Sequence, residues 1–334
     1  MTTAERGSLH PALVCPDCRG PLDDASETGV RCPACHHDFP VAAGGVPILL
    51  SRDSAFDAEA MAAGRDTYHA HMAGESRRKQ RFRRWLPGLA TDLQADDADQ
   101  LVNRRIAEPS DDGAPVAGLV IGAGFRVAEY ADRFPQVSWL VSDTEATFGA
   151  GVVGDATSLP VADGSQGVVL CEHVLEHVVD PLAAAREIER VLRPGGTAMI
   201  KVPFNYPWHG AFIDFFRFTP AGYLAAFRRL ETVHVGHGPG PASTITYALQ
   251  GAFLSLFTGR LSRRVAVVLG RLVFGPWRKL DRVLVTRNGS LGSSCSLIFI
   301  GTRVERARTT PEVIAEAKAL GLAPVVGPAD RTLV

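Results

Sequence analysis

Four of the six cysteines form two Cys-x-x-Cys pairs, Cys15 with Cys18 and Cys32 with Cys35. A turn of this kind directs two thiolates at one ion, and two such turns complete the tetrahedral coordination of Zn²⁺. Because four thiolates leave no position for water, the spacing predicts a structural zinc site. The two histidines that follow the last cysteine offer a replacement ligand, but four thiolates suffice.

A second chemical signal lies in the middle of the chain. The apolar run 116–121 ends in Gly122-Ala123-Gly124, and Asp143 follows about twenty residues later. Glycines let the backbone approach a ligand closely, and an aspartate at the end of the next strand is placed to hold both ribose hydroxyls. A bare Gly-x-Gly fits nicotinamide, flavin and adenosylmethionine enzymes alike, and also a simple tight turn. The pattern therefore predicts a nucleoside cofactor but does not say which one.

Three further motifs narrow this choice. They are Gly154-Asp155-Ala156, then Leu175-Glu176-His177, then the run EIERVLRPGG at 187–196. In this order and spacing, the chain resembles class I adenosylmethionine-dependent methyltransferases, specifically the ubiquinone-biosynthesis-like group. The resemblance spans roughly residues 116–227. It leaves a nicotinamide oxidoreductase as a weaker alternative, which does not explain the later motifs.

The resemblance implies a set of cofactor-binding residues, namely Gly122, Ala123, Gly124, Asp143, Asp155, Ala156 and Cys171. The two glycines would face the methionine part, and Asp143 would hold the ribose. Asp155 would accept a hydrogen bond from the adenine amino group, while the backbone of Ala156 addresses the ring. Cys171 would offer its carbonyl oxygen to the methionine amine.

The chain departs from the family pattern at three places. Val120 stands where the family has an acidic residue, Arg126 replaces the third glycine, and Gln166-Gly167 replaces Phe-Asp. Loss of the acid removes an anchor of the cofactor loop, so a catalytically silent methyltransferase-like partner subunit is the alternative to an active enzyme. Arg126 could instead address the carboxylate of the methionine moiety. Because Asp143, Asp155 and the Leu-Glu-His segment are retained, we favour an active enzyme.

Histidines and aromatic residues indicate where the methyl acceptor would bind. His173 and His177 are four residues apart, and we expect both on one face at the start of a helix beyond the fourth strand. His173, nearer the strand end, is the predicted general base for a hydroxyl acceptor, whereas His177 would contact substrate or orient the helix. Tyr206 and His209 follow the fifth strand and are predicted catalytic residues of the acceptor side.

The segment DFFRFT at 214–219 is similar to a signature in methyltransferases of sugars, polysaccharides and small metabolites, where it lines the acceptor pocket. Asp214 and Arg217 are therefore predicted to contact substrate. Their spacing equally fits an ion pair at a helix start.

These residues require a scaffold, and the alternation of apolar runs with helical stretches predicts one. Expected strands are 116–121, 137–141, 152–153, 168–170 and 197–202, followed by 231–235 and 295–301. Expected helices include 128–134 and 181–192. We predict an α/β fold, a Rossmann-like seven-stranded sheet with helices on both faces and ligands at the carboxyl ends of its strands. A small amino-terminal zinc ribbon precedes it.

The domain boundaries follow from the same patterns. We expect a zinc ribbon at 1–50, a helical linker at 51–115, a methyltransferase domain at 116–305 and a tail at 306–334 with a helix at 311–320. From residue 11 to about residue 50, short strands flank the cysteine pairs. That stretch resembles the small bacterial zinc-ribbon family related to the activator subunit of tRNA, rRNA and release-factor methyltransferases, which implies docking to a protein partner.

A helical insertion is expected at about 238–290, between the sixth and seventh strands. Its residues 244–275 combine apolar residues at helical spacing with arginines, a pattern that fits a lid packed over the acceptor site or peripheral contact with a membrane surface. The basic aromatic run 77–85 could contact phosphates, although a solvated helix face explains it as well.

Composition limits the partners. The chain has 334 residues and a formal net charge of −1, which does not favour nucleic acid as a partner. Its start holds no signal-peptide pattern, and its longest apolar stretch, 244–259, is too short to span a membrane, so a cytoplasmic protein is expected. We predict methyl transfer from adenosylmethionine to an oxygen or nitrogen of a small metabolite or glycan.

Overall fold

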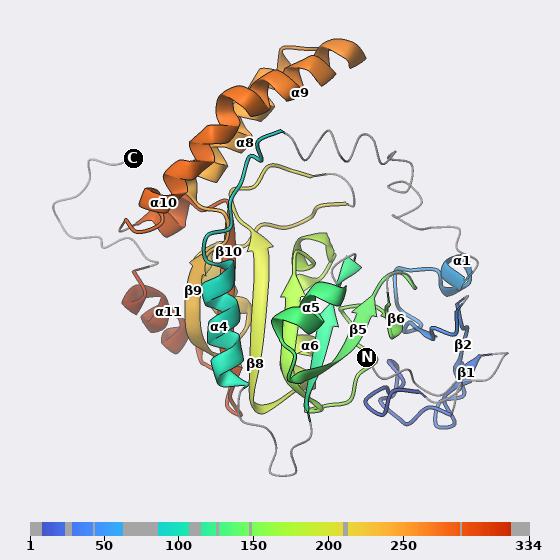
Figure 1. Ribbon diagram of the computed structural model, residues 1–334. Helices are drawn as coiled ribbons and strands as arrows, with labels where there is room; N and C mark the ends of the chain where they lie inside the picture. Colours follow the sequence, from blue (N-terminus) through green and yellow to red (C-terminus); the bar gives the residue numbers. More distant parts are fainter. Residues whose placement is uncertain are drawn as a thin grey trace.

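The computed structural model describes residues 9–23, 29–42, 44–62, 86–106, 115–124, 127–146, 149–209, 213–287 and 289–321. Within them, an eight-stranded mixed sheet forms the centre of the molecule (Figure 1). Its strands in spatial order are β3 (Ile48–Leu49), β6 (Val152–Gly154), β5 (Val137–Asp143), β4 (Val116–Ile121), β7 (Gln166–Glu172), β8 (Leu192–Pro203), β10 (Ser296–Arg303) and β9 (Leu230–His237).

Seven of these strands are the ones expected from the sequence, and the α/β Rossmann-like prediction is confirmed. The neighbours from β3 to β8 pair in parallel, and β10 is antiparallel to both β8 and β9. The eighth strand, β3, was expected in the zinc ribbon. Instead, Ile48 and Leu49 pair in parallel with Val153 and Gly154, so the amino-terminal segment extends the central sheet.

Helices cover both faces of the sheet. On one face, α4 (Ala95–Arg105) and α5 (Val127–Arg133) bury Val102 and Tyr130 against the strands. On the other face, α6 (Pro181–Val191) and α7 (Pro220–Ala226) pack into the larger core. The described helices also include α1 (Ala58–Ala62) in the expected linker and α11 (Thr310–Ala319) in the tail. Strands buried on both faces explain the continuous apolar runs of the sequence.

The amino-terminal segment packs directly on the central sheet domain. Its short hairpin, β1 (Val30–Arg31) with β2 (Asp38–Phe39), buries Phe39 in the same hydrophobic core as α6 and α7. Leu13 forms an isolated antiparallel bridge with Val161. The guanidinium of Arg19 donates to the carbonyl oxygen of Leu159 at 2.7 Å and to the carboxylate of Glu187 at 3.1 Å. The segment is therefore held by apolar burial, strand pairing and a partly buried ion pair.

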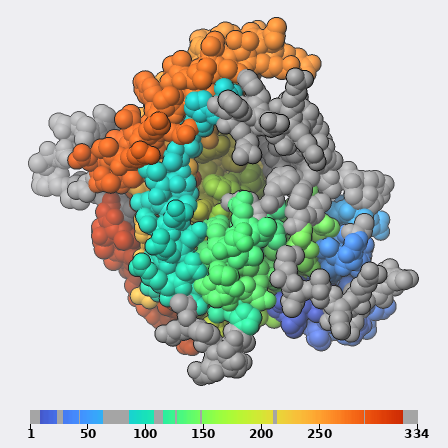
Figure 2. Space-filling view, in the orientation of Figure 1, coloured from blue at the N-terminus to red at the C-terminus, as the bar shows by residue number. Residues whose placement is uncertain are grey.

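The expected insertion forms a group of helices that extends past the sheet (Figures 1 and 2). Its elements, in order, are α8 (Pro241–Ser255), α9 (Arg260–Phe274), η3 (Gly275–Leu280), α10 (Asp281–Leu284) and η4 (Ser290–Ser293). The buried carboxylate of Asp281 accepts hydrogen bonds from the backbone N–H groups of Ala242 and Ser243 at the start of α8. These bonds close the insertion on itself. Among the described helices, none has the length and apolar character needed to cross a membrane.

Candidate active site

The glycine turn lies at the carboxyl end of β4. Gly122 and Gly124 have φ of 67° and 51°, a left-handed conformation that side chains with a Cβ rarely adopt. At Gly122 a Cβ would also come within 2.4 Å of Val174. The carboxylate of Asp143, at the end of β5, accepts a hydrogen bond of 2.9 Å from the backbone N–H of Gly124. This bond ties the glycine turn to the end of β5.

Asp155 and Ala156 follow β6 and are both buried. One carboxylate oxygen of Asp155 accepts from the backbone and hydroxyl of Thr157, and the other accepts from the Ser54 hydroxyl at 2.9 Å. A carboxylate has about four acceptor positions, so one remains for an amine. Cys171 lies in β7 beside β4 and is buried. Of the residues that depart from the family pattern, Val120 is a buried residue of β4, while Arg126 lies outside the described residues.

The expectation that His173 and His177 share a helix face is wrong. β7 ends at Glu172, and His173 then has φ of 59°, so it precedes the short 3-10 helix η2 (Leu175–His177). A left-handed conformation at a residue other than glycine is strained, and such strain gathers at functional sites. The His173 backbone N–H donates to the carbonyl oxygen of Lys201 in β8, a bond that holds this turn in place.

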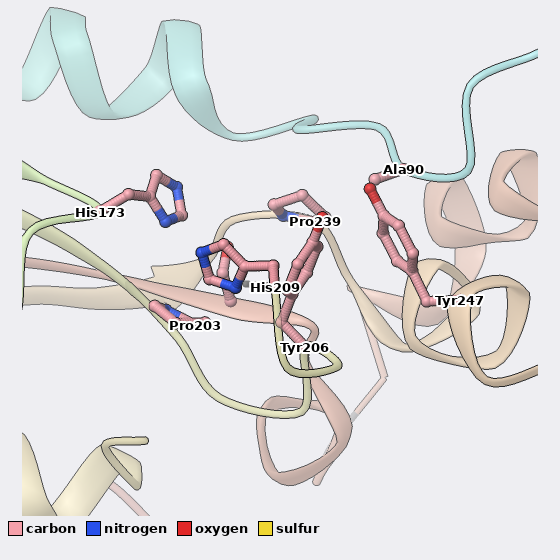
Figure 3. Close-up of a pocket in the computed structure, with 8 residues that line it drawn as sticks. Ala90, His173, Pro203, Tyr206, His209, Pro239 and Tyr247 are labelled. Carbon is pink, nitrogen blue, oxygen red and sulfur yellow. The ribbon is translucent and has the colours of Figure 1, made fainter. Parts of the chain in front are cut away.

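A cavity of about 250 Å³ opens beside His173 (Figure 3). All three predicted catalytic residues, His173, Tyr206 and His209, lie in its wall, and the two imidazoles point toward one another. The remaining lining residues come from several segments of the chain, namely Ala90, Pro203, Pro239, Tyr247 and Ser296. The ring of Tyr206 is 4.6 Å from that of Tyr247 in α8, in an edge arrangement. Sequence reasoning missed Ala90 and Tyr247 because no local pattern relates them to the strand ends.

The carboxylate of Glu176 lies at the centre of the histidine cluster and was missed from the sequence. Its side chain is 0% exposed. Its oxygen Oε1 is 3.5 Å from Nδ1 of His173, 3.8 Å from Nε2 of His177 and 3.8 Å from Nε2 of His209. The backbone N–H groups of Phe215 and Phe216 donate to the Glu176 carbonyl oxygen. The repeated Glu-His pairs at 172–177 were the available signal.

Asp214 and Arg217 form an ion pair, which was one of the two alternatives expected from their spacing. The pair does not lie at a helix start, because α7 begins at Pro220 with Thr219 as its cap. Arg217 donates to both carboxylate oxygens of Asp214 and to the carbonyl oxygen of Tyr206, and it lowers the pKa of Asp214 to about 2. Burial lowers the pKa of His209, while the Asp214 carboxylate, 3.2 Å from its Nδ1, opposes that shift.

The four predicted zinc ligands come together. Their sulfur atoms lie within 4.8 Å of one another, with Cys15 and Cys35 3.6 Å apart and Cys18 and Cys32 3.5 Å apart. The backbone N–H of His37 lowers the pKa of Cys35 to about 7, and burial raises that of Cys15 to about 12. The His37 ring turns to Asp17, at 2.6 Å, and not to the sulfur atoms. Four sulfur atoms in this arrangement fit a tetrahedral Zn²⁺ ion.

Comparison with known families gives one match for the segment with the four cysteines and one for the sheet domain. Residues 129–200 match the methyltransferase domain family, and residues 8–44 match the Trm112p-like protein family. The chain combines a Trm112p-like domain with a methyltransferase domain. The methyltransferase match contains most of α5, the strands β5 to β7 and most of β8, so it includes His173 but begins after the glycine turn and ends before Tyr206 and His209.

Curated relatives resemble the methyltransferase domain. An uncharacterized methyltransferase of Mycobacterium sp. (strain JLS) is 34% identical over 137 residues, which cover 39% of this chain and 52% of that protein. A demethylmenaquinone methyltransferase of Mycobacterium sp. (strain KMS) is 41% identical over 121 residues, 30% of this chain and 51% of that protein. The chain thus spans about half the length of these relatives.

Solved structures to which this chain is similar include a Haloferax volcanii complex of the Trm112 methyltransferase activator and the putative methyltransferase. It has a TM-score of 0.36 and 19% identity, and the match covers 64% of this chain and 99% of that chain. Geranyl diphosphate C-methyltransferase from Streptomyces coelicolor A3(2) has a TM-score of 0.40 and 16% identity, covering 64% of this chain and 80% of that chain.

Proposed function

We propose that this chain transfers a methyl group from adenosylmethionine to an oxygen or nitrogen of a small metabolite or glycan. The observation that carries the proposal is the position of the glycine turn. Gly122 and Gly124, with Asp143 bonded to the turn, lie at the same strand ends as the cavity beside His173. When bound there, adenosylmethionine supplies an electrophilic methyl group on a sulfonium. The chain must then hold the cofactor and align the acceptor.

The residues that would hold the cofactor are Gly122, Ala123, Gly124, Asp143, Asp155, Ala156 and Cys171. Asp143 is placed to accept from ribose hydroxyls, because its two oxygens receive only one bond each, from Gly124 and, at 3.5 Å, from the Thr144 hydroxyl. Asp155 retains acceptor capacity for the adenine amine beside its bonds to Ser54 and Thr157. The Ser54 contact comes from the segment after the Trm112p-like domain, so that segment would close over the adenine end.

For a hydroxyl acceptor, His173 is the proposed general base. Its imidazole is partly exposed and faces the cavity from the end of β7 (Figure 3). Proton removal by a positioned histidine raises the nucleophilicity of the acceptor oxygen as the carbon–oxygen bond forms. An amine acceptor would need alignment more than a base. His209 and Tyr206 complete the wall that would orient the acceptor.

The cavity favours a small acceptor. Its volume, about 250 Å³, lies below the ~300–1,000 Å³ of pockets that hold drug-sized ligands. Tyr206 and Tyr247 offer aromatic rings with polar tips, which suit the face and hydroxyl groups of a sugar or a phenol. Arg217 donates to the Asp214 carboxylate and to the carbonyl oxygen of Tyr206, and Asp214 also accepts from the backbone N–H of His209. We therefore propose that Asp214 and Arg217 mainly position His209. Contact of His177, Asp214 and Arg217 with the substrate would be a secondary role.

The Trm112p-like domain has its proposed partner within the chain. The surface that it presents through Leu13, Arg19 and Phe39 contacts the methyltransferase domain, and β3 continues the methyltransferase sheet. This arrangement supports a stabilising role in cis. A catalytically silent partner subunit is the alternative function that Val120 raises, but the open cavity beside a strained histidine favours catalysis.

An activity screen tests the proposal. The purified chain is incubated with adenosylmethionine and panels of sugars, phenols and amines, and products are detected by mass spectrometry. We expect a methylated product from at least one panel, and His173→Ala should lower its formation. No adenosylmethionine binding by the folded, zinc-loaded chain would favour the silent subunit.

A further inference from the structure

The carboxylate of Glu176 is a buried charge without a hydrogen-bond partner. Among the described residues, no donor reaches either Oε1 or Oε2 within hydrogen-bond geometry, and the side chain is fully buried. Transfer of a carboxylate out of water is costly unless a donor, a proton or a cation compensates it. Its surroundings should therefore supply a positive charge, and the groups that face it are imidazoles.

The distances to these imidazoles fit coordination better than hydrogen bonding. Nε2 of His177 and Nε2 of His209 are each 3.8 Å from Oε1 of Glu176, beyond the ~2.7–3.2 Å of N–H···O bonds. Two donor atoms that bind one zinc ion tetrahedrally, each at about 2.1 Å, are about 3.4 Å apart. All three ligand atoms lie within 4.8 Å of one another. The three atoms would move inward to enclose an ion.

The outer nitrogen atoms of both rings face acceptors. Nδ1 of His177 is 3.1 Å from the carbonyl oxygen of Ile213, so Nδ1 carries the hydrogen and donates it. Nδ1 of His209 faces a carboxylate oxygen of Asp214 at 3.2 Å; the contact is not aligned as a hydrogen bond, so its effect is electrostatic. Metal-ligating histidines have carbonyl or carboxylate partners at this position, which direct the Nε2 lone pair to the ion. Without a cation, the Nε2 lone pair of His177 would face the Glu176 carboxylate and repel it.

We propose that Glu176, His177 and His209 bind one divalent first-row transition metal ion. Two imidazoles and one carboxylate suit Zn²⁺, Mn²⁺, Fe²⁺ or Co²⁺. The ion would lie beneath the cavity beside His173, whose Nδ1 is 3.5 Å from the same carboxylate. There it would bind an acceptor oxygen and lower the pKa of its hydroxyl. This catalytic role rests on the proposed function, whereas binding of the ion does not.

Cobalt absorption tests the metal site. The zinc-loaded chain, with its four-cysteine site filled, is titrated with Co²⁺. We expect visible d–d absorption without thiolate-to-cobalt charge-transfer bands, since the ligands are nitrogen and oxygen. Glu176→Gln should weaken cobalt binding by at least about tenfold. Glu129→Gln, the same change at an exposed glutamate of α5, should leave it unchanged.

Two results would overturn the metal site: no Co²⁺ absorption in the wild-type chain, or unchanged cobalt affinity in Glu176→Gln. Circular dichroism of both variants establishes that they are folded, and His209→Gln serves as a second variant if Glu176→Gln does not fold. Adenosylmethionine binding is measured on the same samples. A cobalt site without cofactor binding would count against the proposed function alone.

An independent observation concerns the surface of the insertion. Residues 241–287 contain eight basic residues and one acidic residue, Asp281, a net charge of +7 in a chain whose total is −1. Asp281 is buried at the start of α8, so it does not offset the exposed charge. The insertion also carries a large share of the exposed apolar side chains among the described residues, including those of Leu256, Leu261, Val265, Leu269, Leu272, Val273, Trp277, Leu280 and Val283.

The exposed side chains of α9 are arranged in stripes. At about 100° per residue, Leu261, Val265, Leu269 and Leu272 form one exposed apolar stripe. Three arginines, at 260, 264 and 271, form a neighbouring basic stripe. The buried residues of α9 are small, namely Ala266 and Gly270. They let α9 pack closely on α8, since a Cβ at Gly270 would meet Gln250 of α8 at 2.2 Å. A helix with this pattern, long apolar side chains beside arginines, is typical of helices that lie in a membrane interface.

We infer that α9 rests on the surface of an anionic lipid bilayer. Figure 2 shows α9 projecting from the body of the molecule, where a flat surface can reach it. Apolar side chains would enter the headgroup boundary, and the arginines would pair with lipid phosphates. We favour a bilayer over an acidic protein for two reasons. The apolar stripe runs along the helix, as the acyl boundary of a bilayer requires, and the stripe beside it contains only positive charges, which suit lipid phosphates. The sequence favoured a packed lid; Tyr247 of α8 does line the cavity, but the outer stripe of α9 is exposed.

Vesicle co-sedimentation tests this surface. We expect the chain to bind phosphatidylglycerol vesicles and not phosphatidylcholine vesicles. Leu269→Ser, at a side chain 49% exposed, should weaken binding by about tenfold, and Arg264→Gln by about fivefold. Leu182→Ser, the same change at a leucine 50% exposed on α6, is the matched control and should have no effect. Failure to bind anionic vesicles, or equal loss in the Leu182 control, would overturn the proposal.

Discussion

Phe39 provides the sharpest test of how the Trm112p-like domain is joined to the methyltransferase domain. Its ring is 2% exposed and belongs to the core that includes α6 and α7. Phe39→Ala removes this ring and leaves a cavity, at a cost of about 3–5 kcal/mol. If the two domains unfold together, the whole chain loses this stability. With a urea slope of about 3 kcal/mol per M, the midpoint falls by about 1–2 M.

Far-ultraviolet circular dichroism measures the effect of Phe39→Ala on the helices outside the Trm112p-like domain. The described part of residues 9–50 contains no α-helix, so the helical signal reports the methyltransferase domain and its neighbours. Phe56→Ala makes the same deletion at a ring 41% exposed and should change stability by less than about 0.5 kcal/mol. The reasoning would be refuted if Phe39→Ala released zinc to a chelator more readily while the helical midpoint stayed unchanged.

The other predictions concern the metal, the cofactor and the base. The chain should contain one tightly bound Zn²⁺ at Cys15, Cys18, Cys32 and Cys35; Cys18→Ser should lower zinc content in metal analysis, and zinc held equally well would contradict the site. Asp155→Ala should weaken adenosylmethionine binding by about 1–3 kcal/mol in calorimetry, because the adenine amine loses an acceptor. His173→Ala should lower turnover by about 10²–10⁴-fold with nearly normal cofactor affinity. Near-normal turnover would mean that alignment alone supports the reaction.

The sheet was predictable from the sequence because its strands are buried on both faces. The strand 116–121 appears as an apolar run, and the helices α5, α6 and α7 follow β4, β7 and β8 along the chain. β3 was placed in the wrong sheet because two residues carry no information about their partner. Ile48 and Leu49 are equally apolar against a zinc ribbon or against β6, and only the packing of the Trm112p-like domain decides between them.

The site was predictable only in part. His173, Tyr206 and His209 were found because they follow strand ends, where the carboxyl edge of the sheet collects side chains. The left-handed turn at His173 was not foreseen, since nothing in a Glu-His sequence distinguishes a helix start from a strained turn. Glu176 was overlooked for a related reason: its importance comes from three imidazoles that approach it from a turn, a short helix and a distant loop.

Calorimetric binding of adenosylmethionine to the wild-type chain and to Asp143→Ala tests the central claim most directly. Asp143 holds the glycine turn through Gly124 and is the proposed partner of the ribose, so its loss removes both contacts. The account predicts one equivalent of cofactor bound by the wild type and an affinity about 5- to 150-fold lower in the variant, which corresponds to about 1–3 kcal/mol. No binding to the folded, zinc-loaded wild type, or the same affinity in both proteins, would contradict it.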